Sequence, residues 1–284
     1  MGVKENQIRP KYTYVIVEPG STPERQLTRM IDMIGIAMEA GASAIKFQWT
    51  SSPERMVERR RVPIDYLDSY RLIAFPLEWF PILRAVCGDC DIDLGCTVYL
   101  PEDIDKVAQY VRFFKISSFE SGLREMQASM EEYSTIPKLV SLGARTHEEV
   151  KAIKQAIPVE VRAQYQWLHC ISAYPAPQDM LQLGVLHGGE YDGFSDHSRM
   201  ITTGGVAVAA GASILECHAC HPKTPKTNKD FIVSLSPKEL QGYISHVRTI
   251  EEMLWHHHSS ERALLGVEAG MRRYQVDPDH FGTP

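Results

Sequence analysis

The fold is decided by a repeat that first appears between residues 12 and 50, YTYVIVEPGSTPERQLTRMIDMIGIAMEAGASAIKFQWT. Two short apolar runs, YTYVIVE (12–18) and AIKFQWT (44–50), flank a longer segment (23–41) whose apolar residues recur every three or four positions. That spacing is typical of an amphipathic helix, and Gly41 is of a residue type that often ends one. The stretch therefore predicts a strand–helix–strand unit.

The same alternation continues along the chain. Six further strand-like runs follow, at residues 92–99, 113–118, 138–144, 166–174, 192–198 and 213–219. Helical patterns separate them, including one that runs from a capping-box sequence at Thr146 to Ala156 and a last one at 236–254. Eight strands that alternate with helices, without a Pro- or Gly-rich hinge, predict an α/β fold, a single (β/α)8 TIM barrel over residues 1–260. The tail at 261–284 has no assignable pattern.

Composition restricts the class of protein. The 284 residues are 44% hydrophobic and 23% charged, which is ordinary for a globular protein. A net charge of −6 argues against nucleic acid or an anionic membrane as a partner. No apolar run approaches the roughly 20 residues of a membrane span, and the first residues lack a secretory signal pattern. Several of the six cysteines lie in apolar runs, as free thiols do, so we expect a cytoplasmic protein.

Polar side chains end the strand runs, which is where the active site of such a barrel lies. They are Glu18, Lys46, Gln48, Thr97, Lys115, Ser118, Ser141, Tyr174, Asp196, His197, Glu216 and His218. Lysines together with hydroxyls suit a phosphate or a carboxylate, and two histidines from neighbouring strands suit a divalent metal. The strand ends therefore predict a site for an anionic substrate and a metal.

A second motif, Cys217-His-Ala-Cys220-His221, has the C-x-x-C-H spacing that attaches c-type haem. Because side chains alternate along a strand, Glu216 and His218 should share one face and Cys217 should take the other. We therefore expect His218 to point into the barrel as a metal ligand, in preference to a haem site or a zinc site on Cys217, Cys220 and His221.

A basic cluster, ERMVERRR (54–61), lies in the long interval between the second and third strand runs. We interpret it as part of a solvated loop, in preference to a binding site.

Six segments, in order, resemble the signatures of the sialic acid synthase family. They are AGASAIKFQ (40–48), KISSFE (115–120), LHCISAYPAP (168–177), GFSDHS (193–198), GASILECH (211–218) and DFIVSLSPKEL (230–240). That family condenses phosphoenolpyruvate with a sugar aldehyde. The resemblance therefore implies a metal-dependent transferase that joins phosphoenolpyruvate to an aldehyde, releases phosphate and forms a 2-keto-3-deoxy sugar acid. It also implies a homodimer.

The resemblance assigns roles to individual residues. It implies phosphoenolpyruvate contacts by Lys46, Thr97, Lys115, Ser118, Ser141 and Ser195, and acceptor contacts by Glu18, Gln48, Ser172, Tyr174 and Asp230. It implies a divalent metal on His197 and His218, typically Mn²⁺, with Mg²⁺ or Co²⁺ as alternatives. Catalytic roles are implied for Lys115, Glu18 and Glu120, with Glu120 near the reacting carbons.

The acceptor side departs from the family pattern. PGSTPE follows Glu18 where the family has Asn-His-x-Gly, Ser172 stands where Asn is usual, and the resemblance ends before the family's C-terminal antifreeze-like domain. We therefore expect the reaction type to be kept with a different acceptor, and poor activity on N-acetylmannosamine or its 6-phosphate. The alternatives are a pyruvate-dependent aldolase or lyase, a Schiff-base enzyme that uses Lys115 or Lys46, and a degenerate barrel that binds a ligand without catalysis.

Overall fold

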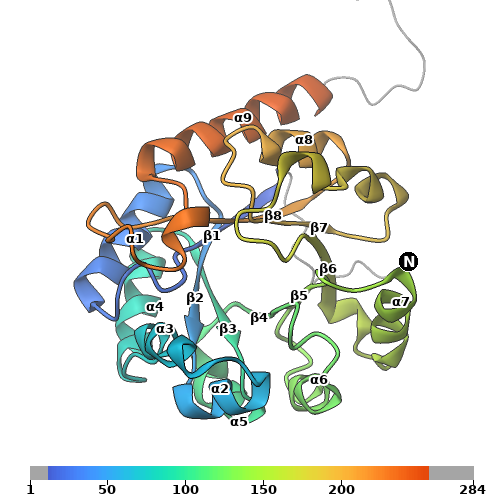
Figure 1. The fold of residues 1–284 in the computed structure, drawn as a ribbon. Coiled ribbons are helices and arrows are strands. Elements are labelled where there is room, and N and C mark those ends of the chain that lie inside the picture. Colours follow the sequence, from blue (N-terminus) through green and yellow to red (C-terminus); the bar gives the residue numbers. More distant parts are fainter. Residues whose placement is uncertain (1–11, 256–284) are drawn as a thin grey trace, which may run out of the picture. The chain divides into compact units, whose positions relative to one another are not determined.

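The computed structural model describes residues 12–255 and shows a closed barrel of parallel strands (Figure 1). The strands are β1 (Tyr14–Glu18), β2 (Ala44–Trp49), β3 (Asp93–Val98), β4 (Phe113–Ile116), β5 (Lys138–Ser141), β6 (Tyr165–Cys170), β7 (Gly193–Asp196) and β8 (Ile214–His218). Each strand pairs with the next, and β8 closes the barrel on β1, with His218 opposite Glu18. The predicted (β/α)8 TIM barrel is confirmed, and each predicted strand run overlaps one strand.

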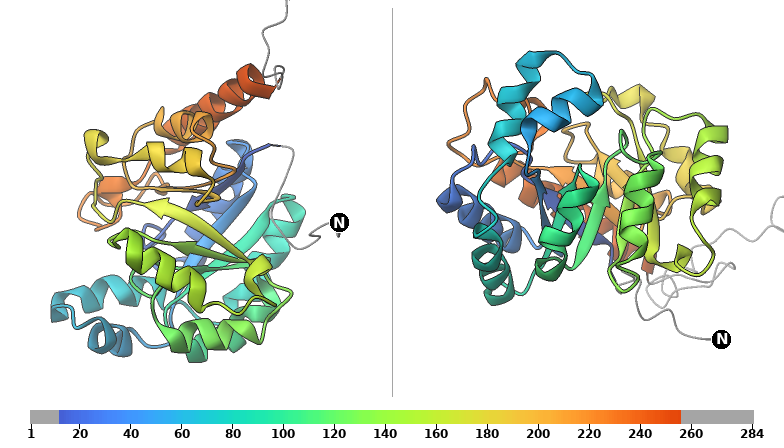
Figure 2. Two further views of the ribbon diagram at one scale, coloured as in Figure 1. Left: turned by 90° about the vertical axis from the view of Figure 1, so that its right-hand side faces the viewer. Right: turned by 90° about the horizontal axis from the view of Figure 1, so that it is seen from below.

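Helices surround the strands (Figure 2). They are α1 (Leu27–Glu39), α2 (Pro53–Arg60), α3 (Leu67–Ile73), α4 (Trp79–Asp89), α5 (Pro101–Val107), α6 (Arg124–Glu131), α7 (His147–Ala156), α8 (Thr203–Ala209) and α9 (Pro237–Trp255). The predicted capping box at the start of α7 is present between Thr146 and Glu149, and Gly41 follows α1 with a positive φ of 84°. The predicted tail at 261–284 lies outside the described residues. Within those residues, no helix combines the length and the apolar composition needed to cross a membrane.

Two connections depart from a simple strand–helix alternation. In the described chain, β6 and β7 are joined by 3-10 helices at Gln178–Met180 and Leu183–Gly188, because two prolines and several glycines in this segment disfavour an α-helix. Between β2 and α4 the chain forms α2, a 3-10 helix at Ile64–Tyr66, and α3. The basic cluster lies on α2, so its prediction as a solvated loop is wrong. The side chain of Arg60, at the end of α2, is only 18% exposed.

Apolar side chains fill the barrel beneath its carboxyl-terminal mouth. The interior cluster consists of Tyr14, Ile16, Ala44, Phe113, Leu139, Leu168 and Ile214. Gly95 on β3 makes room for this packing, since a Cβ there would lie 2.2 Å from the ring of Phe113. The filled interior leaves only the carboxyl ends of the strands for a polar cavity.

Candidate active site

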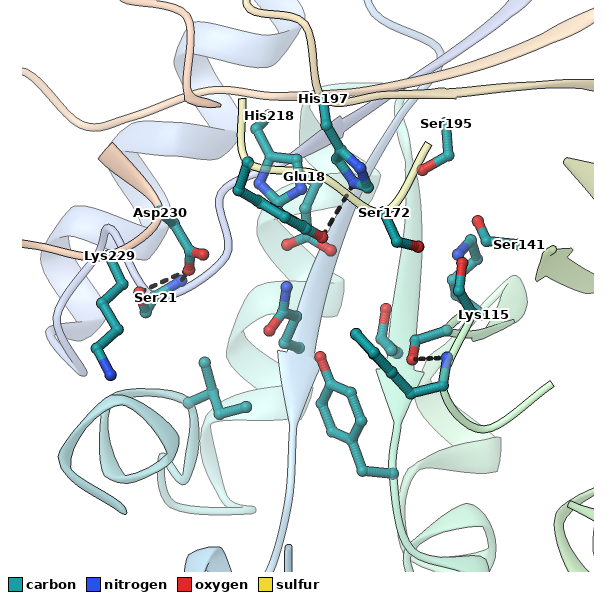
Figure 3. A pocket seen from close by; sticks show the side chains of 18 of the residues that line it. Glu18, Ser21, Lys115, Ser141, Ser172, Ser195, His197, His218, Lys229 and Asp230 are labelled. Atoms are coloured by element: carbon teal, nitrogen blue, oxygen red, sulfur yellow. Dashed lines mark hydrogen bonds between the residues drawn. The ribbon is translucent and has the colours of Figure 1, made fainter. Parts of the chain in front are cut away.

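A cavity of about 400 Å³ lies at the carboxyl ends of the strands. It is lined by all the residues predicted to contact phosphoenolpyruvate, the acceptor or the metal, which are Lys46, Thr97, Lys115, Ser118, Ser141, Ser195, Glu18, Gln48, Ser172, Tyr174, Asp230, His197 and His218. Figure 3 shows ten of the lining residues, labelled, around this space. The structure thus brings these residues together, and their individual roles stay predictions.

The bottom of the cavity holds two buried lysines. Lys46 and Lys115 are 1% and 3% exposed. Lys46 forms a salt bridge with Glu18 and donates a hydrogen bond to Thr97 Oγ1 at 2.6 Å. The Glu216 carboxylate lies 4.0 Å from Lys46 Nζ and 3.8 Å from Lys115 Nζ. Burial would raise the pKa of Glu216, but the two ammonium groups hold it down at about 2, so this carboxylate stays ionised between them.

Serine hydroxyls surround the lysines. The Ser141 hydroxyl is buried and makes no hydrogen bond within the protein. Ser118 Oγ accepts a hydrogen bond from Gly143 N–H at 3.0 Å, and Ser195 Oγ donates one to Glu216 Oε1 at 3.1 Å. A buried hydroxyl without a partner beside two lysines is a donor available to an anionic ligand. We call the buried set of Glu18, Lys46, Lys115, Ser141, Ser195 and Glu216 the polar floor.

The two predicted metal ligands lie at the ends of neighbouring strands, with their ring centroids 5.3 Å apart. His197 Nδ1 donates to the Ile171 carbonyl oxygen at 2.9 Å, and its Nε2 lies 3.1 Å from the Tyr174 hydroxyl. Burial would lower the pKa of His197, but Cys170 and the Ile171 carbonyl raise it to about 9. Burial and the neighbouring His197 lower the pKa of His218. His218 Nδ1 is buried without a hydrogen-bond partner, so this ring has a nitrogen free for a ligand.

The donor set at the mouth fits an open metal site. Among residues 12–255, no three His, Cys, Asp or Glu side chains converge as a closed metal site would require. Two imidazoles leave coordination positions for water and substrate, as a catalytic metal needs. The lining cations Lys46, Lys115, Lys229 and Arg60 stand against the carboxylates of Glu18, Glu216 and Asp230.

The C-x-x-C-H stretch is split between environments. Glu216 and His218 line the cavity, whereas Cys217 packs in the core between the strands and the helices, as the predicted alternation requires. Cys220 is also buried, and His221 Nε2 lies 3.2 Å from the Asp32 carboxylate.

Glu120 does not line this cavity but a neighbouring one, so its predicted position near the reacting carbons stays a prediction. Its carboxylate accepts hydrogen bonds from Arg60 Nε at 2.8 Å and from Arg60 Nη2 at 2.7 Å, and another from the Ser117 hydroxyl. Glu216, which was predicted at the mouth without an individual role, lies between the two lysines.

One side of the cavity is aromatic, and sequence reasoning missed it. Arg60 of α2 lies against three rings, with its guanidinium carbon 4.8 Å from the ring centroid of Tyr99, 5.0 Å from Phe119 and 5.7 Å from Tyr70. Tyr66 adjoins Tyr70, with 6.3 Å between their centroids. These five residues, Arg60, Tyr66, Tyr70, Tyr99 and Phe119, form what we call the aromatic wall. The i, i+4 spacing of Tyr66 and Tyr70 beside the basic cluster was the signal available in the sequence.

The first loop, residues 19–24 after β1, departs in sequence from the family pattern and is hydrogen-bonded to the predicted acceptor residue Asp230. Ser21 donates to Asp230 Oδ2 from its backbone N–H at 2.7 Å and from its hydroxyl at 2.6 Å (Figure 3). Gly20 has a positive φ of 56°, and a Cβ there would lie 2.6 Å from Asp230 Oδ2. The loop therefore fixes the Asp230 carboxylate at the mouth.

Together, the barrel and this cavity define a TIM-barrel protein with a buried polar floor and two adjacent histidines at its mouth. The NeuB family profile matches residues 33–259, and the chain belongs to the NeuB family. This finding confirms the resemblance to sialic acid synthases.

Two relatives show how far the similarity extends. The N-acetylneuraminate-9-phosphate synthase of Drosophila melanogaster is 26% identical over 249 residues, which cover 81% of this chain and 65% of that protein. The pseudaminic acid synthase of Campylobacter jejuni is 26% identical over 265 residues, which cover 86% of this chain and 75% of that protein. The match thus spans less than two thirds of the fly protein.

Two solved structures share the fold. The sialic acid synthetase of Leptospira borgpetersenii superposes with a TM-score of 0.80 at 22% identity, over 93% of this chain and 91% of that one. The spore coat polysaccharide biosynthesis protein SpsE of Bacillus subtilis gives 0.77 at 24% identity, over 96% and 80%.

Proposed function

We propose that this chain joins phosphoenolpyruvate to an aldehyde acceptor, releases phosphate and forms a 2-keto-3-deoxy acid. The reaction would use a divalent metal, with Mn²⁺ as the preferred ion. The observation that carries this proposal is the buried pair Lys46 and Lys115, which lines one cavity together with the unpartnered Ser141 hydroxyl. Membership of the NeuB family supports it, since relatives of this chain are named as N-acetylneuraminate-9-phosphate and pseudaminic acid synthases.

The polar floor would bind phosphoenolpyruvate. Lys46 and Lys115 would hold its phosphate and carboxylate as point charges, and the hydroxyls of Ser118, Ser141 and Ser195 would donate to its oxygens. Hydrogen bonds to charged groups contribute roughly 1.5–3 kcal/mol each. Pyruvate has a carboxylate but no phosphate, so an enzyme that used pyruvate would need neither the second buried lysine nor this number of hydroxyls.

His197 and His218 would hold the metal, which when bound polarises the aldehyde oxygen of the acceptor. The chain orients these rings through the Ile171 carbonyl and through Tyr174, which stacks on His197 with 4.3 Å between centroids. Carbon 3 of phosphoenolpyruvate then attacks the aldehyde carbon, water adds at carbon 2, and phosphate leaves. We assign the water's proton to Glu18, because this carboxylate lines the cavity and Glu120 does not.

The test is phosphate release from phosphoenolpyruvate, with Mn²⁺, across a panel of sugar and sugar-like aldehydes. We expect phosphate and a carbon–carbon-bonded product in equal amounts, measured by a phosphate assay and by mass spectrometry. A product formed from pyruvate without phosphate would indicate the aldolase alternative, and borohydride trapping on Lys46 or Lys115 would indicate a Schiff base. Ligand binding without turnover of any aldehyde would indicate a degenerate barrel.

A further inference from the structure

The aromatic wall belongs to two neighbouring cavities. A second cavity, of about 740 Å³, shares with the active-site cavity all five residues of the aromatic wall. Two of the rings remain accessible, with Phe119 57% and Tyr66 39% exposed. Rings at the mouth of a polar cavity, with their surface open, are available to a ligand that extends beyond the floor.

The arginine in this wall is not available to bind an anion. Its Nε and Nη2 donate to Glu120, and its Nη1 donates to the Tyr70 hydroxyl at 3.3 Å. Burial opposes the charge of Arg60, but Glu120 keeps its pKa above the ordinary value. The guanidinium group is therefore neutralised within the chain, and it supports the rings that pack against it.

A second cation at this side of the active-site cavity also lies over a ring. Lys229 Nζ is 3.7 Å from the ring centroid of Tyr66, and the adjacent Asp230 is held by the first loop. The aliphatic side chains of Ile73 and Ile232 line the same cavity. This side of the site therefore presents ring faces and aliphatic groups, with Arg60 paired to Glu120 and Lys229 lying over the Tyr66 ring.

We propose that the acceptor carries an uncharged planar ring, aromatic or heteroaromatic, next to its aldehyde-bearing part, and that Phe119, Tyr66 and Tyr70 bind this ring. The inference rests on the proposed function for the existence of an acceptor, and it names the class to which that acceptor belongs. Aromatic rings pair favourably with other aromatic rings through offset-stacked or edge-to-face contacts.

The experiment compares ligands that differ only in the ring. Isothermal titration calorimetry on the full chain would compare the affinities of adenosine and phenyl β-D-ribofuranoside with that of methyl β-D-ribofuranoside. The corresponding 5′-aldehydes would be assayed for phosphate release. We expect each ringed ligand to bind about tenfold more tightly than the methyl glycoside. Phe119→Ala should remove most of this preference, whereas Phe119→Tyr, which keeps the ring, should retain it. Lys226→Met, at an exposed lysine that lines neither cavity, should leave ring binding unchanged.

The two proposals fail in distinguishable ways. Equal affinity of ringed and ringless ligands, or a preference that survives Phe119→Ala, would overturn the role of the aromatic wall, even where phosphate release supports the reaction. Ring-dependent binding without phosphate release from any aldehyde would support the aromatic wall and contradict the proposed reaction.

Discussion

The polar floor and the aromatic wall line the same cavity, but they are built differently. Floor residues lie on barrel strands, and their charges face carboxylates on other strands of the barrel, such as Glu18 for Lys46 and Glu216 for Lys115. Wall residues come from α2, from the segment that follows it, and from the chain beyond β3 and β4. Under the proposed function, the barrel strands would bind phosphoenolpyruvate, and the connections between them would select the acceptor.

The largest expected effect concerns the metal at the edge of the floor. EDTA should abolish phosphate release and Mn²⁺ should restore it, while His197→Ala or His218→Ala should remove the response. Metal binding is measured directly by electron paramagnetic resonance of Mn²⁺. Phe119→Ala on the wall and the double variant Cys217→Ser, Cys220→Ser should both keep the metal. Loss of the metal in the cysteine variant would show that the histidines are wrongly assigned.

The next effect tests whether the floor alone binds phosphoenolpyruvate. Lys115→Met should weaken phosphoenolpyruvate binding by roughly 1.5–3 kcal/mol, because it removes a charge-assisted contact. Lys226→Met, at an exposed lysine, is the matched control and should change the affinity little. Binding is measured by calorimetry in the presence of Mn²⁺. If the two variants bind phosphoenolpyruvate equally well, the floor is not its site.

A third experiment tests what holds the wall in place. Arg60→Leu should lower the free energy of unfolding by about 2 kcal/mol, since it leaves the Glu120 carboxylate buried and unpaired. This expected loss of stability is smaller than for a fully buried ion pair, because the Arg60 side chain is partly exposed. The double variant Arg60→Leu, Glu120→Leu should recover most of the loss in urea denaturation. A double variant as unstable as the single one would mean that ring packing, not the ion pair, fixes the wall.

The smallest expected effect concerns Ser141, whose hydroxyl should contribute to phosphoenolpyruvate affinity but not to the stability of the fold. Ser141→Ala removes a hydroxyl without a partner in the protein, so stability should change by less than about 0.5 kcal/mol, while phosphoenolpyruvate affinity should fall by about 0.5–1.5 kcal/mol. Ser121→Ala is the opposite case, because its hydroxyl donates to the Ser118 carbonyl at 2.8 Å. That variant should lose about 1 kcal/mol of stability in denaturant titrations. An equal loss of stability in both would contradict the assignment of Ser141 as a ligand donor.

Local signals were enough to predict the barrel and the placement of most floor residues. The runs that contain β1 and β2 are short and apolar, and α7 has its capping box within the sequence. Once eight such units are recognised, the geometry of a parallel barrel brings the strand ends to one mouth. The residues at those ends, such as Lys46 and His218, therefore follow from the pattern.

The rule that strand ends meet at one mouth did not predict the positions of the Glu120 and Arg60 side chains. Glu120 follows β4 closely enough to suggest the mouth, but its carboxylate turns to Arg60, 60 residues earlier in the chain. Arg60 lies in a basic cluster, which is usually solvated, and it is buried only because that carboxylate neutralises it. No local pattern carries that pairing.

The sequence by itself determined the alternation of strands and helices, the residues at the strand ends and the family, because each depends on periodicity or on short motifs. Only the tertiary structure decided that Glu216 lies between the two lysines, that Ser141 lacks a partner and that an aromatic wall faces the floor. These features depend on which side chains meet from distant segments, and burial and charge neutralisation then select among the contacts that the chain could make.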